Sequence, residues 1–250
     1  MVAVELKGVH RTFGPVHALE NVDLTVHPGV TALLGVNGAG KTTLMRILTG
    51  VLEPTSGEVV LGSDDGGKVL RRRDLGRHVG YMPQTVLAVP GMNASQYLRY
   101  VGFLKSLDGR EAKAEAARVL ELVDLAPQAS TATKVLSGGM LRRLGLAAAL
   151  VGSPTVIVLD EPMAGLDVEQ RTKMRSVIRA SATDAPILLS THLAEDVAEI
   201  GDRVCVLHAG RVRYDGTLTD FVKTPIDGRA VERAFLSVVA IGVDAGGGEW

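Results

Sequence analysis

The sequence predicts an α/β protein with a mainly parallel β-sheet, an antiparallel β subdomain at the N-terminus and an inserted α-helical subdomain. Three observations support this fold class. In the second half of the chain, short apolar runs typical of buried strands alternate with helical patterns. Near the N-terminus, a glycine-rich loop lies between a short apolar run and a helical pattern. Between Gln84 and Ser137 the pattern is helical only, so this block interrupts the alternation.

Length and composition are those of a globular protein. The chain has 250 residues, of which 46% are hydrophobic and 22% charged, and its formal net charge is −1. The chain as a whole therefore has no excess of positive charge that would favour nucleic acid, and we expect no nucleic-acid partner. One basic run, residues 68–77, is expected to be a solvated loop or helix face. The sequence has one cysteine, Cys205, which lies in an apolar run. Because a disulfide needs two cysteines, no intramolecular disulfide is possible.

No segment of the sequence has the pattern of a membrane span or a signal peptide. The N-terminus lacks a basic region followed by a long apolar stretch. The most apolar region, residues 144–159, is interrupted by Ser153 and Pro154. Because a spanning helix needs about 20 consecutive apolar residues, we expect that the chain does not cross a membrane by itself.

The N-terminal part is expected to be rich in strands. Gly29 and Gly57 belong to the turn-forming sequences Pro-Gly and Pro-Thr-Ser-Gly, and Gly50 is expected to end a helix. The elements predicted here are strands over 2–6, 22–26 and 30–34 and a helix over 42–49.

The remaining elements follow from apolar runs and helical spacing. Helices are predicted over 95–107, 110–122, up to 150, 168–180, 193–200 and 231–239, and strands over 155–159, 186–190 and 203–207. The Gly-rich, acidic tail 244–250 is expected to be disordered. The resulting division is a core of residues 1–222 with a helical insertion over about 85–136, and a C-terminal part of residues 223–250.

The strongest motif is Gly35-Val-Asn-Gly-Ala-Gly-Lys41-Thr42, which has the spacing Gly, four residues, Gly-Lys-Thr. Such a loop turns backbone amides toward phosphates, Lys41 adds a positive charge, and the Thr42 hydroxyl can bind Mg²⁺. A dinucleotide-binding turn also uses glycines between a strand and a helix, but it does not need the Lys-Thr pair. The loop therefore predicts the core of a P-loop NTPase. The residues assigned to nucleotide binding here are Gly35, Asn37, Gly38, Ala39, Gly40, Lys41, Thr42 and Thr43.

A pair of acidic residues ends the buried run Val156-Ile-Val-Leu. Asp160 is predicted to lie at the carboxyl end of a strand, where a carboxylate can bind Mg²⁺ beside the phosphates. Glu161 is then placed to polarise the attacking water, which predicts hydrolysis and not transfer to an acceptor. The alternative for Glu161 is a surface acid without a role.

The segment Leu136-Ser-Gly-Gly-Met140 strongly resembles the Leu-Ser-Gly-Gly-Gln signature of the ATP-binding cassette family. A serine and two glycine amides at the start of a helix can bind a phosphate. In that family the phosphate belongs to ATP held by a second subunit, and the resemblance implies this role for Ser137, Gly138 and Gly139. Met140 departs from the usual glutamine and removes one polar contact.

Four more residues match the family in its order along the chain. Gln84 resembles the glutamine that contacts Mg²⁺ and the attacking water, and His192 resembles the switch histidine at the γ-phosphate. Asp167, in Ala-Gly-Leu-Asp, resembles the loop that crosses the dimer interface. Phe13 resembles the aromatic residue that stacks on adenine, where tyrosine is commoner, and a core aromatic residue is the alternative reading.

The resemblance covers about residues 2–222 and implies an ATP- and Mg²⁺-dependent ATPase subunit of an export-type transporter. It implies a dimer, expected to be a homodimer, with two ATP molecules at its interface. The helical insertion near 84–107 would contact a separate membrane-spanning permease, which places the chain on the cytoplasmic face of the membrane. A cassette ATPase of iron–sulfur cluster assembly remains a rival. Chromosome-maintenance ATPases are disfavoured because no long coiled coil separates Lys41 from Ser137, and a non-enzymatic module is disfavoured by Glu161, Gln84 and His192 together.

Overall fold

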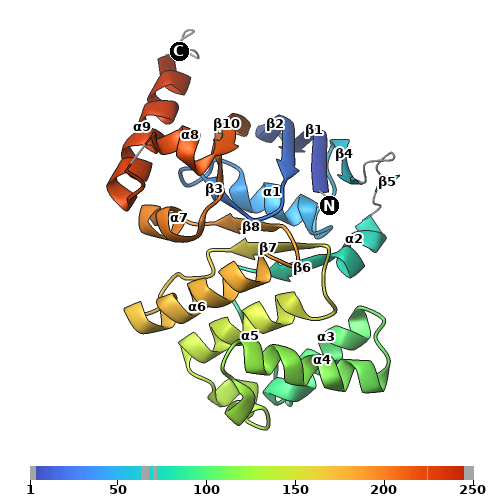
Figure 1. Cartoon of the computed structure of the whole chain (residues 1–250). Helices are drawn as coiled ribbons and strands as arrows, with labels where there is room; N and C mark the ends of the chain where they lie inside the picture. Colours follow the sequence, from blue (N-terminus) through green and yellow to red (C-terminus); the bar gives the residue numbers. More distant parts are fainter. Residues whose placement is uncertain (1–3, 63–67, 70–71, 224, 245–250) are drawn as a thin grey trace.

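A computed structural model of the chain describes residues 4–62, 68–69, 72–223 and 225–244. It contains two β-sheets with helices around them (Figure 1). The larger sheet has the strand order β10-β9-β3-β8-β7-β6. Its strands are β3 (Val30–Leu34), β6 (Val79–Met82), β7 (Val156–Asp160), β8 (Ile187–Ser190), β9 (Arg203–His208) and β10 (Arg211–Thr217). All neighbouring strands are parallel except β9 and β10, which confirms the predicted, mainly parallel sheet.

The smaller sheet is antiparallel and has the order β2-β1-β4-β5. Its strands are β1 (Val4–Phe13), β2 (Val16–Val26), β4 (Ser56–Leu61) and β5 (Lys68–Val69). The predicted antiparallel N-terminal subdomain is therefore confirmed. The first two strands are longer than expected because β1 and β2 form a hairpin that pairs as far as Phe13 and Val16. The strand β4 begins at Ser56, within the residues expected to form a turn, because these residues pair with β1 and take an extended conformation.

The helices of the described residues are distributed over the whole chain. They are α1 (Lys41–Leu48), α2 (Arg72–His78), α3 (Ala94–Leu104), α4 (Gly109–Leu122), α5 (Gly138–Leu150), α6 (Val168–Ser181), α7 (Ala194–Ile200), α8 (Leu218–Val222) and α9 (Gly228–Asp244), with 3-10 turns at Ala126–Gln128 and Thr133–Val135. The helices α3 and α4 lie within the expected insertion, and capping boxes at Asn93 and Asp108 define where they begin. The domain boundaries themselves stay a prediction.

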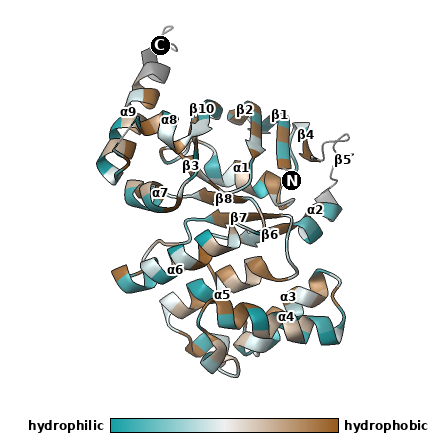
Figure 2. Ribbon diagram, viewed as in Figure 1, coloured by the Kyte–Doolittle hydropathy of each residue, from teal (hydrophilic) through white to brown (hydrophobic). Residues whose placement is uncertain are grey.

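The central strands have apolar side chains on both faces, which explains their continuous hydrophobic runs. Both β7 and β8 are brown in Figure 2, and every residue of both strands is buried. Along β7 the side chains alternate between two cores. Ile157 and Leu159 pack with α4, α5 and α6, whereas Val156 and Val158 pack with α1 and the antiparallel sheet. The strand ends are thus held rigidly between two packed layers.

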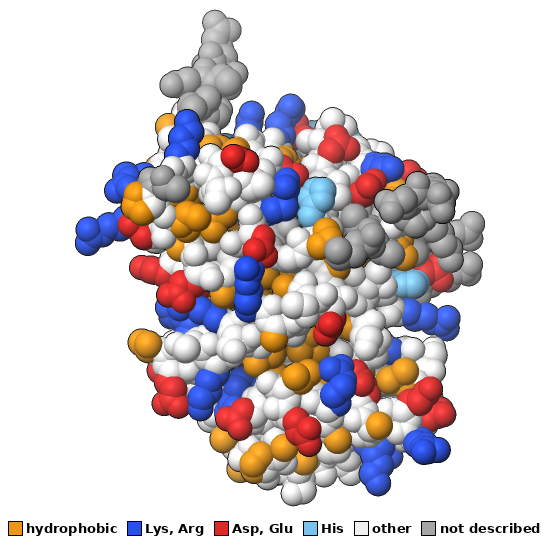
Figure 3. Space-filling model, viewed as in Figure 1, with side chains coloured by type: hydrophobic (Ala, Val, Ile, Leu, Met, Phe, Trp, Pro, Cys, Tyr) orange, Lys and Arg blue, Asp and Glu red, His pale blue; other side chains and the backbone are white. Residues whose placement is uncertain are grey.

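The C-terminal helix α9 is longer than predicted and packs against α7, α8, β9 and β10. Part of the predicted disordered tail, residues 245–250, lies outside the described residues, as does Arg71 of the basic run. Cys205 is fully buried, as its apolar run suggests, and burial raises the pKa of its thiol. Among the helices that the structure describes, none is long and apolar enough to cross a membrane. Basic and acidic side chains are interspersed over the face shown in Figure 3.

Candidate active site

The glycine-rich loop and the acidic strand end line one cavity. The cavity has a volume of about 320 Å³ and lies where β3 leads into α1. The residues that line it are Val16, His17, Ala18, Val36, Asn37, Gly38, Ala39, Gly40, Lys41, Thr42, Thr43, Gln84, Asp160 and Glu161. The structure therefore brings together the phosphate-loop residues, Gln84 and the acidic pair, which are far apart in the sequence. Among the loop residues assigned from the sequence, Gly35 instead lines a neighbouring cavity of about 540 Å³.

The conformation of the loop depends on two glycines. Gly40 precedes α1 with φ 105°, a value that favours glycine, and a Cβ atom there would lie 2.6 Å from the carbonyl oxygen of Ala18. A Cβ atom on Gly35 would lie 2.5 Å from the carbonyl oxygen of Leu207. The loop backbone is therefore packed closely against β2 and β9. The N-terminus of α1, with its free amides and positive dipole end, faces the cavity and favours an anion there.

Lys41 supplies the positive charge of the cavity. Its Nζ donates hydrogen bonds to the carbonyl oxygens of Gly35, at 2.6 Å, and Val36, at 3.2 Å. Burial lowers the pKa of Lys41, and the negative charges of Glu161 and Asp160 oppose that shift. These contacts hold the ammonium group over the loop, close enough to the two carboxylates for their charges to act on it.

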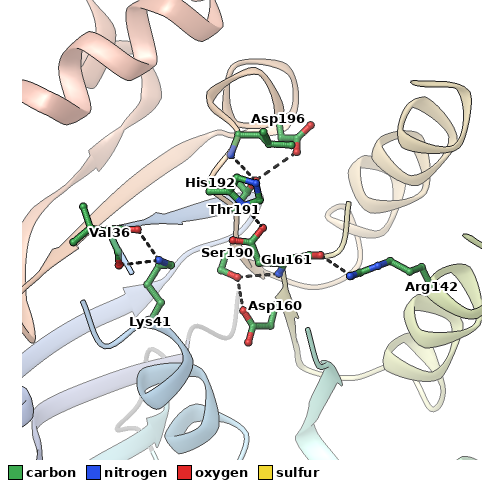
Figure 4. Close-up of polar contacts among 11 residues, drawn as sticks. Val36, Lys41, Arg142, Asp160, Glu161, Ser190, Thr191, His192 and Asp196 are labelled. Carbon is green, nitrogen blue, oxygen red and sulfur yellow. Dashed lines mark hydrogen bonds and ion pairs between the residues drawn. The ribbon is translucent and has the colours of Figure 1, made fainter. Parts of the chain in front are cut away.

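Asp160 is held by a serine from the neighbouring strand (Figure 4). The Ser190 hydroxyl donates a hydrogen bond of 2.6 Å to Asp160 Oδ1, and both residues are buried. The same hydroxyl accepts a hydrogen bond of 2.9 Å from the backbone N–H of Glu161. Asp160 and Ser190 are cross-strand neighbours of β7 and β8, so the sheet register makes this contact possible.

Glu161 and His192 are in direct contact, and His192 lines the neighbouring cavity that also includes Gly35. His192 Nδ1 lies 2.7 Å from Glu161 Oε2 (Figure 4). An ionised carboxylate only accepts hydrogen bonds, so the imidazole is the donor. Arg142 of α5 donates a hydrogen bond of 2.7 Å to the Glu161 carbonyl oxygen. Glu161 is thus fixed at its backbone and at its carboxylate.

The signature residues lie outside the cavity. Ser137 caps α5, and its hydroxyl accepts a hydrogen bond of 3.2 Å from the N–H of Met140. Asp167 caps α6 by accepting a bond of 2.8 Å from the N–H of Gln170. A Cβ atom on Gly139 would overlap the Gln170 side chain, so the starts of α5 and α6 touch. The structure therefore brings Ser137, Gly138 and Gly139 close to the Asp167 loop but does not bring them to the phosphate loop of the same chain.

Phe13 is not among the residues that line the cavity. It lies at the tip of the β1–β2 hairpin, with 45% of its surface exposed, and the Arg11 guanidinium stacks over its ring at 4.5 Å. This exposure argues against the alternative of a core aromatic residue. Its role toward adenine stays a prediction.

Sequence reasoning missed several residues at this site. Ser190 and Arg142 hold the acidic pair, Gln170 packs on the signature, and Val16, His17 and Ala18 line the cavity. The position of Ser190 directly before Thr191 and His192, at the end of a buried strand, was a usable signal. The contacts of Arg142 and Gln170 had no local signal, because they join separate helices and loops.

Fold and site together define a P-loop NTPase, with a phosphate loop between a buried strand and a helix and a strand-end carboxylate beside it. Residues 19–164 match the family model described as ABC transporter, and the chain belongs to this family of transporter ATP-binding subunits. It hydrolyses ATP as the ATPase subunit of an export-type transporter.

Similar proteins of known role agree with this membership. The chain is 36% identical over 236 residues to the daunorubicin resistance ATP-binding protein DrrA3 of Streptomyces coeruleorubidus, covering 92% of this chain and 72% of that protein. It is 33% identical over 235 residues to the Nod factor export ATP-binding protein I of Cupriavidus metallidurans, covering 92% of this chain and 76% of that one.

Solved structures with the same fold include an ATP-binding subunit of an ABC transporter. That structure has a TM-score of 0.81 and 26% identity, covering 94% of this chain and 99% of the other. A second is a dimeric ATP-binding cassette in a post-hydrolysis state with ADP and phosphate, with a TM-score of 0.74 and 25% identity, covering 86% and 98%. Subunits of this family therefore form dimers and work with a membrane partner.

Proposed function

We propose that the cavity at the start of α1 binds and hydrolyses ATP, and that hydrolysis powers export through a separate membrane-spanning partner. The observation that carries the proposal is the convergence of Lys41, Thr42, Gln84, Asp160 and Glu161 on one cavity. Lys41 and the loop amides bind the phosphates, and the N-terminus of α1 adds its dipole. Glu161 accepts a proton from the attacking water, and His192 orients the Glu161 carboxylate through their hydrogen bond.

The residues of the cavity suit a magnesium ion as part of the proposal. Mg²⁺ prefers oxygen ligands and is commonly held by one or two carboxylates together with substrate phosphates. Thr42, Gln84 and Asp160 offer a hydroxyl, an amide and a carboxylate oxygen on the same cavity. When bound, the ion would neutralise negative charge that develops on the phosphates.

The second part of the proposal is a homodimer. Ser137, Gly138 and Gly139 lie outside the cavity that holds the phosphate loop of their own chain. A second copy facing the first head to tail would bring these groups to the nucleotide. ATP would then join the two copies, with Asp167 at the interface, and hydrolysis would allow them to separate.

The third part is the membrane partner, which we place on the helical insertion. Tyr100, Phe103 and Leu104 have 47%, 70% and 60% of their surface exposed. They are three and four residues apart on α3, so they share one face of the helix. Leu87, shortly after Gln84, is 75% exposed. Such an apolar surface suits the docking of permease helices, which would place the chain on the cytoplasmic face of the membrane.

Recovery of a polytopic protein with the tagged chain tests the transport role. We expect that membranes solubilised in mild detergent yield a permease bound to this subunit, and that its presence changes the rate of ATP hydrolysis. If the chain binds no membrane protein even when ATP holds the dimer together, the permease part of the proposal is wrong, and iron–sulfur cluster assembly or another ATPase role without a permease becomes the next hypothesis to test.

Replacing Phe103 with Ser tests the docking surface. The change removes a large exposed apolar group from α3 and is expected to lower the recovered permease at least about tenfold, as loss of a buried anchor residue commonly does. The matched control is Leu236→Ser, which removes an exposed apolar side chain from α9. Equal recovery of permease with both variants would contradict the placement on α3.

A further inference from the structure

Glu161 has an unusual backbone conformation for a residue with a side chain. Its φ is 52°, in the left-handed region that favours glycine. Such a conformation costs free energy and persists only where surrounding contacts enforce it. The neighbouring residues therefore have to hold the Glu161 backbone in place.

Two side chains hold this residue from opposite sides (Figure 4). The N–H of Glu161 donates to the Ser190 hydroxyl at 2.9 Å and to the Ser190 carbonyl oxygen at 3.2 Å. The Glu161 carbonyl oxygen accepts from Arg142 Nη1 at 2.7 Å. The amide and carbonyl groups of Glu161 are thus both fixed, one by the sheet and the other by α5.

The Ser190 hydroxyl has a second contact that reaches the other carboxylate. Its single proton is donated to Asp160 Oδ1 at 2.6 Å, while its lone pair accepts from Glu161. Ser190 is 0% exposed and Asp160 is 3% exposed, so water cannot readily replace either bond. One buried hydroxyl therefore sets both the orientation of the Asp160 carboxylate and the position of the Glu161 backbone.

We propose that Ser190 and Arg142 are positioning residues for ATP hydrolysis. Ser190 orients the Asp160 carboxylate for its proposed role as a Mg²⁺ ligand. Ser190 and Arg142 together hold the Glu161 backbone in the left-handed conformation. This inference rests on the proposed roles of Asp160 and Glu161. Neither Ser190 nor Arg142 lines the phosphate cavity, so both act through the acidic pair.

The two residues should differ in what their loss affects. Ser190 contacts both acidic residues, so Ser190→Ala should lower kcat about 10- to 100-fold, as small misplacements of reacting groups do. It should also raise several-fold the Mg²⁺ concentration needed for half-maximal binding of trinitrophenyl-ATP. Arg142 contacts the Glu161 carbonyl, so Arg142→Ala should lower kcat about tenfold and leave the Mg²⁺ dependence of binding unchanged.

Matched variants separate positioning from general damage to the fold. Thr31 is a buried residue on β3, the strand next to β8, and its hydroxyl has no hydrogen-bond partner among the residues that the structure describes. Thr31→Val therefore removes a buried hydroxyl from the same sheet and should leave kcat and Mg²⁺ dependence unchanged. Ser190→Thr keeps a hydroxyl and should recover most of the activity. Binding of trinitrophenyl-ATP in EDTA depends on the loop and Lys41, so it should be the same in all these variants.

Three results would test the proposed roles of Ser190 and Arg142. If Ser190→Ala matches Thr31→Val in kcat and Mg²⁺ dependence while Glu161→Gln is inactive, this inference is wrong and the proposed function stands. If Glu161→Gln itself remains fully active, the proposed function fails first. If Ser190→Ala unfolds, a folded Ser190→Thr variant that does not recover activity would contradict the role of the Ser190 hydroxyl. Arg142→Ala with wild-type kcat would overturn the role of Arg142.

Discussion

Replacing Glu161 with Gln is expected to abolish ATP hydrolysis while ATP still binds. The substitution keeps the size and the hydrogen-bonding reach of the side chain but removes its ability to accept a proton from water. Loss of a general base commonly lowers rates by about 10²- to 10⁴-fold, and we expect kcat to fall within that range. Phosphate release measured at saturating ATP checks this result.

The same variant should accumulate as an ATP-bound dimer, because the nucleotide that joins the two copies is no longer consumed. Size-exclusion chromatography with and without ATP measures this change. Glu121→Gln, the same chemical change on the exposed surface of α4, is the control and should retain wild-type turnover. Wild-type turnover in Glu161→Gln would remove Glu161 from its proposed role.

Replacing Lys41 with Ala is expected to weaken ATP binding itself. Hydrogen bonds to charged groups contribute about 1.5–3 kcal/mol, so ATP affinity should fall about 10- to 100-fold or more. Hydrolysis should fall with it, because the phosphates lose the cation that faces Asp160 and Glu161. Equilibrium binding of a fluorescent ATP analogue measures the loss.

Lys41 also donates to the Gly35 and Val36 carbonyl oxygens, so thermal unfolding of the variant has to be compared with that of the wild type. Lys113→Ala removes an exposed lysine from α4 and serves as the control. Undiminished ATP affinity in a folded Lys41→Ala variant would contradict the phosphate-binding role of the loop.

Much of the site could be predicted from the sequence because its strongest motif is local. The residue types of the segment Gly35–Thr42 indicate a phosphate-binding loop, since its glycines, its lysine and the following helix are consecutive in the sequence. The apolar run before Asp160 likewise indicated a buried strand that ends in a carboxylate, and the structure has that strand. Such features depend on neighbours in the chain, so short-range patterns are enough to predict them.

The interactions around the acidic pair could not be predicted in this way. Ser190 holds Asp160 across 30 residues of sequence, and Arg142 reaches Glu161 across 19. The left-handed conformation of Glu161 had no signal either, because a glutamate predicts no positive φ. The surroundings of Phe13 also could not be predicted from the sequence. The position of Phe13 in the motif suggested adenine stacking, but its contact with the Arg11 guanidinium depends on the structure of the β1–β2 hairpin.

By itself the sequence determined the class of fold, the phosphate loop, the acidic strand end and the membership of the ATP-binding cassette family, because each depends on short local patterns and on their order along the chain. The tertiary structure decided the strand order, the register that places Ser190 opposite Asp160, and the separation of Ser137 from the phosphate loop of its own chain. The physical reason is that buried hydrogen bonds must be satisfied by groups from distant segments, and only the packed sheet and helices determine which groups those are.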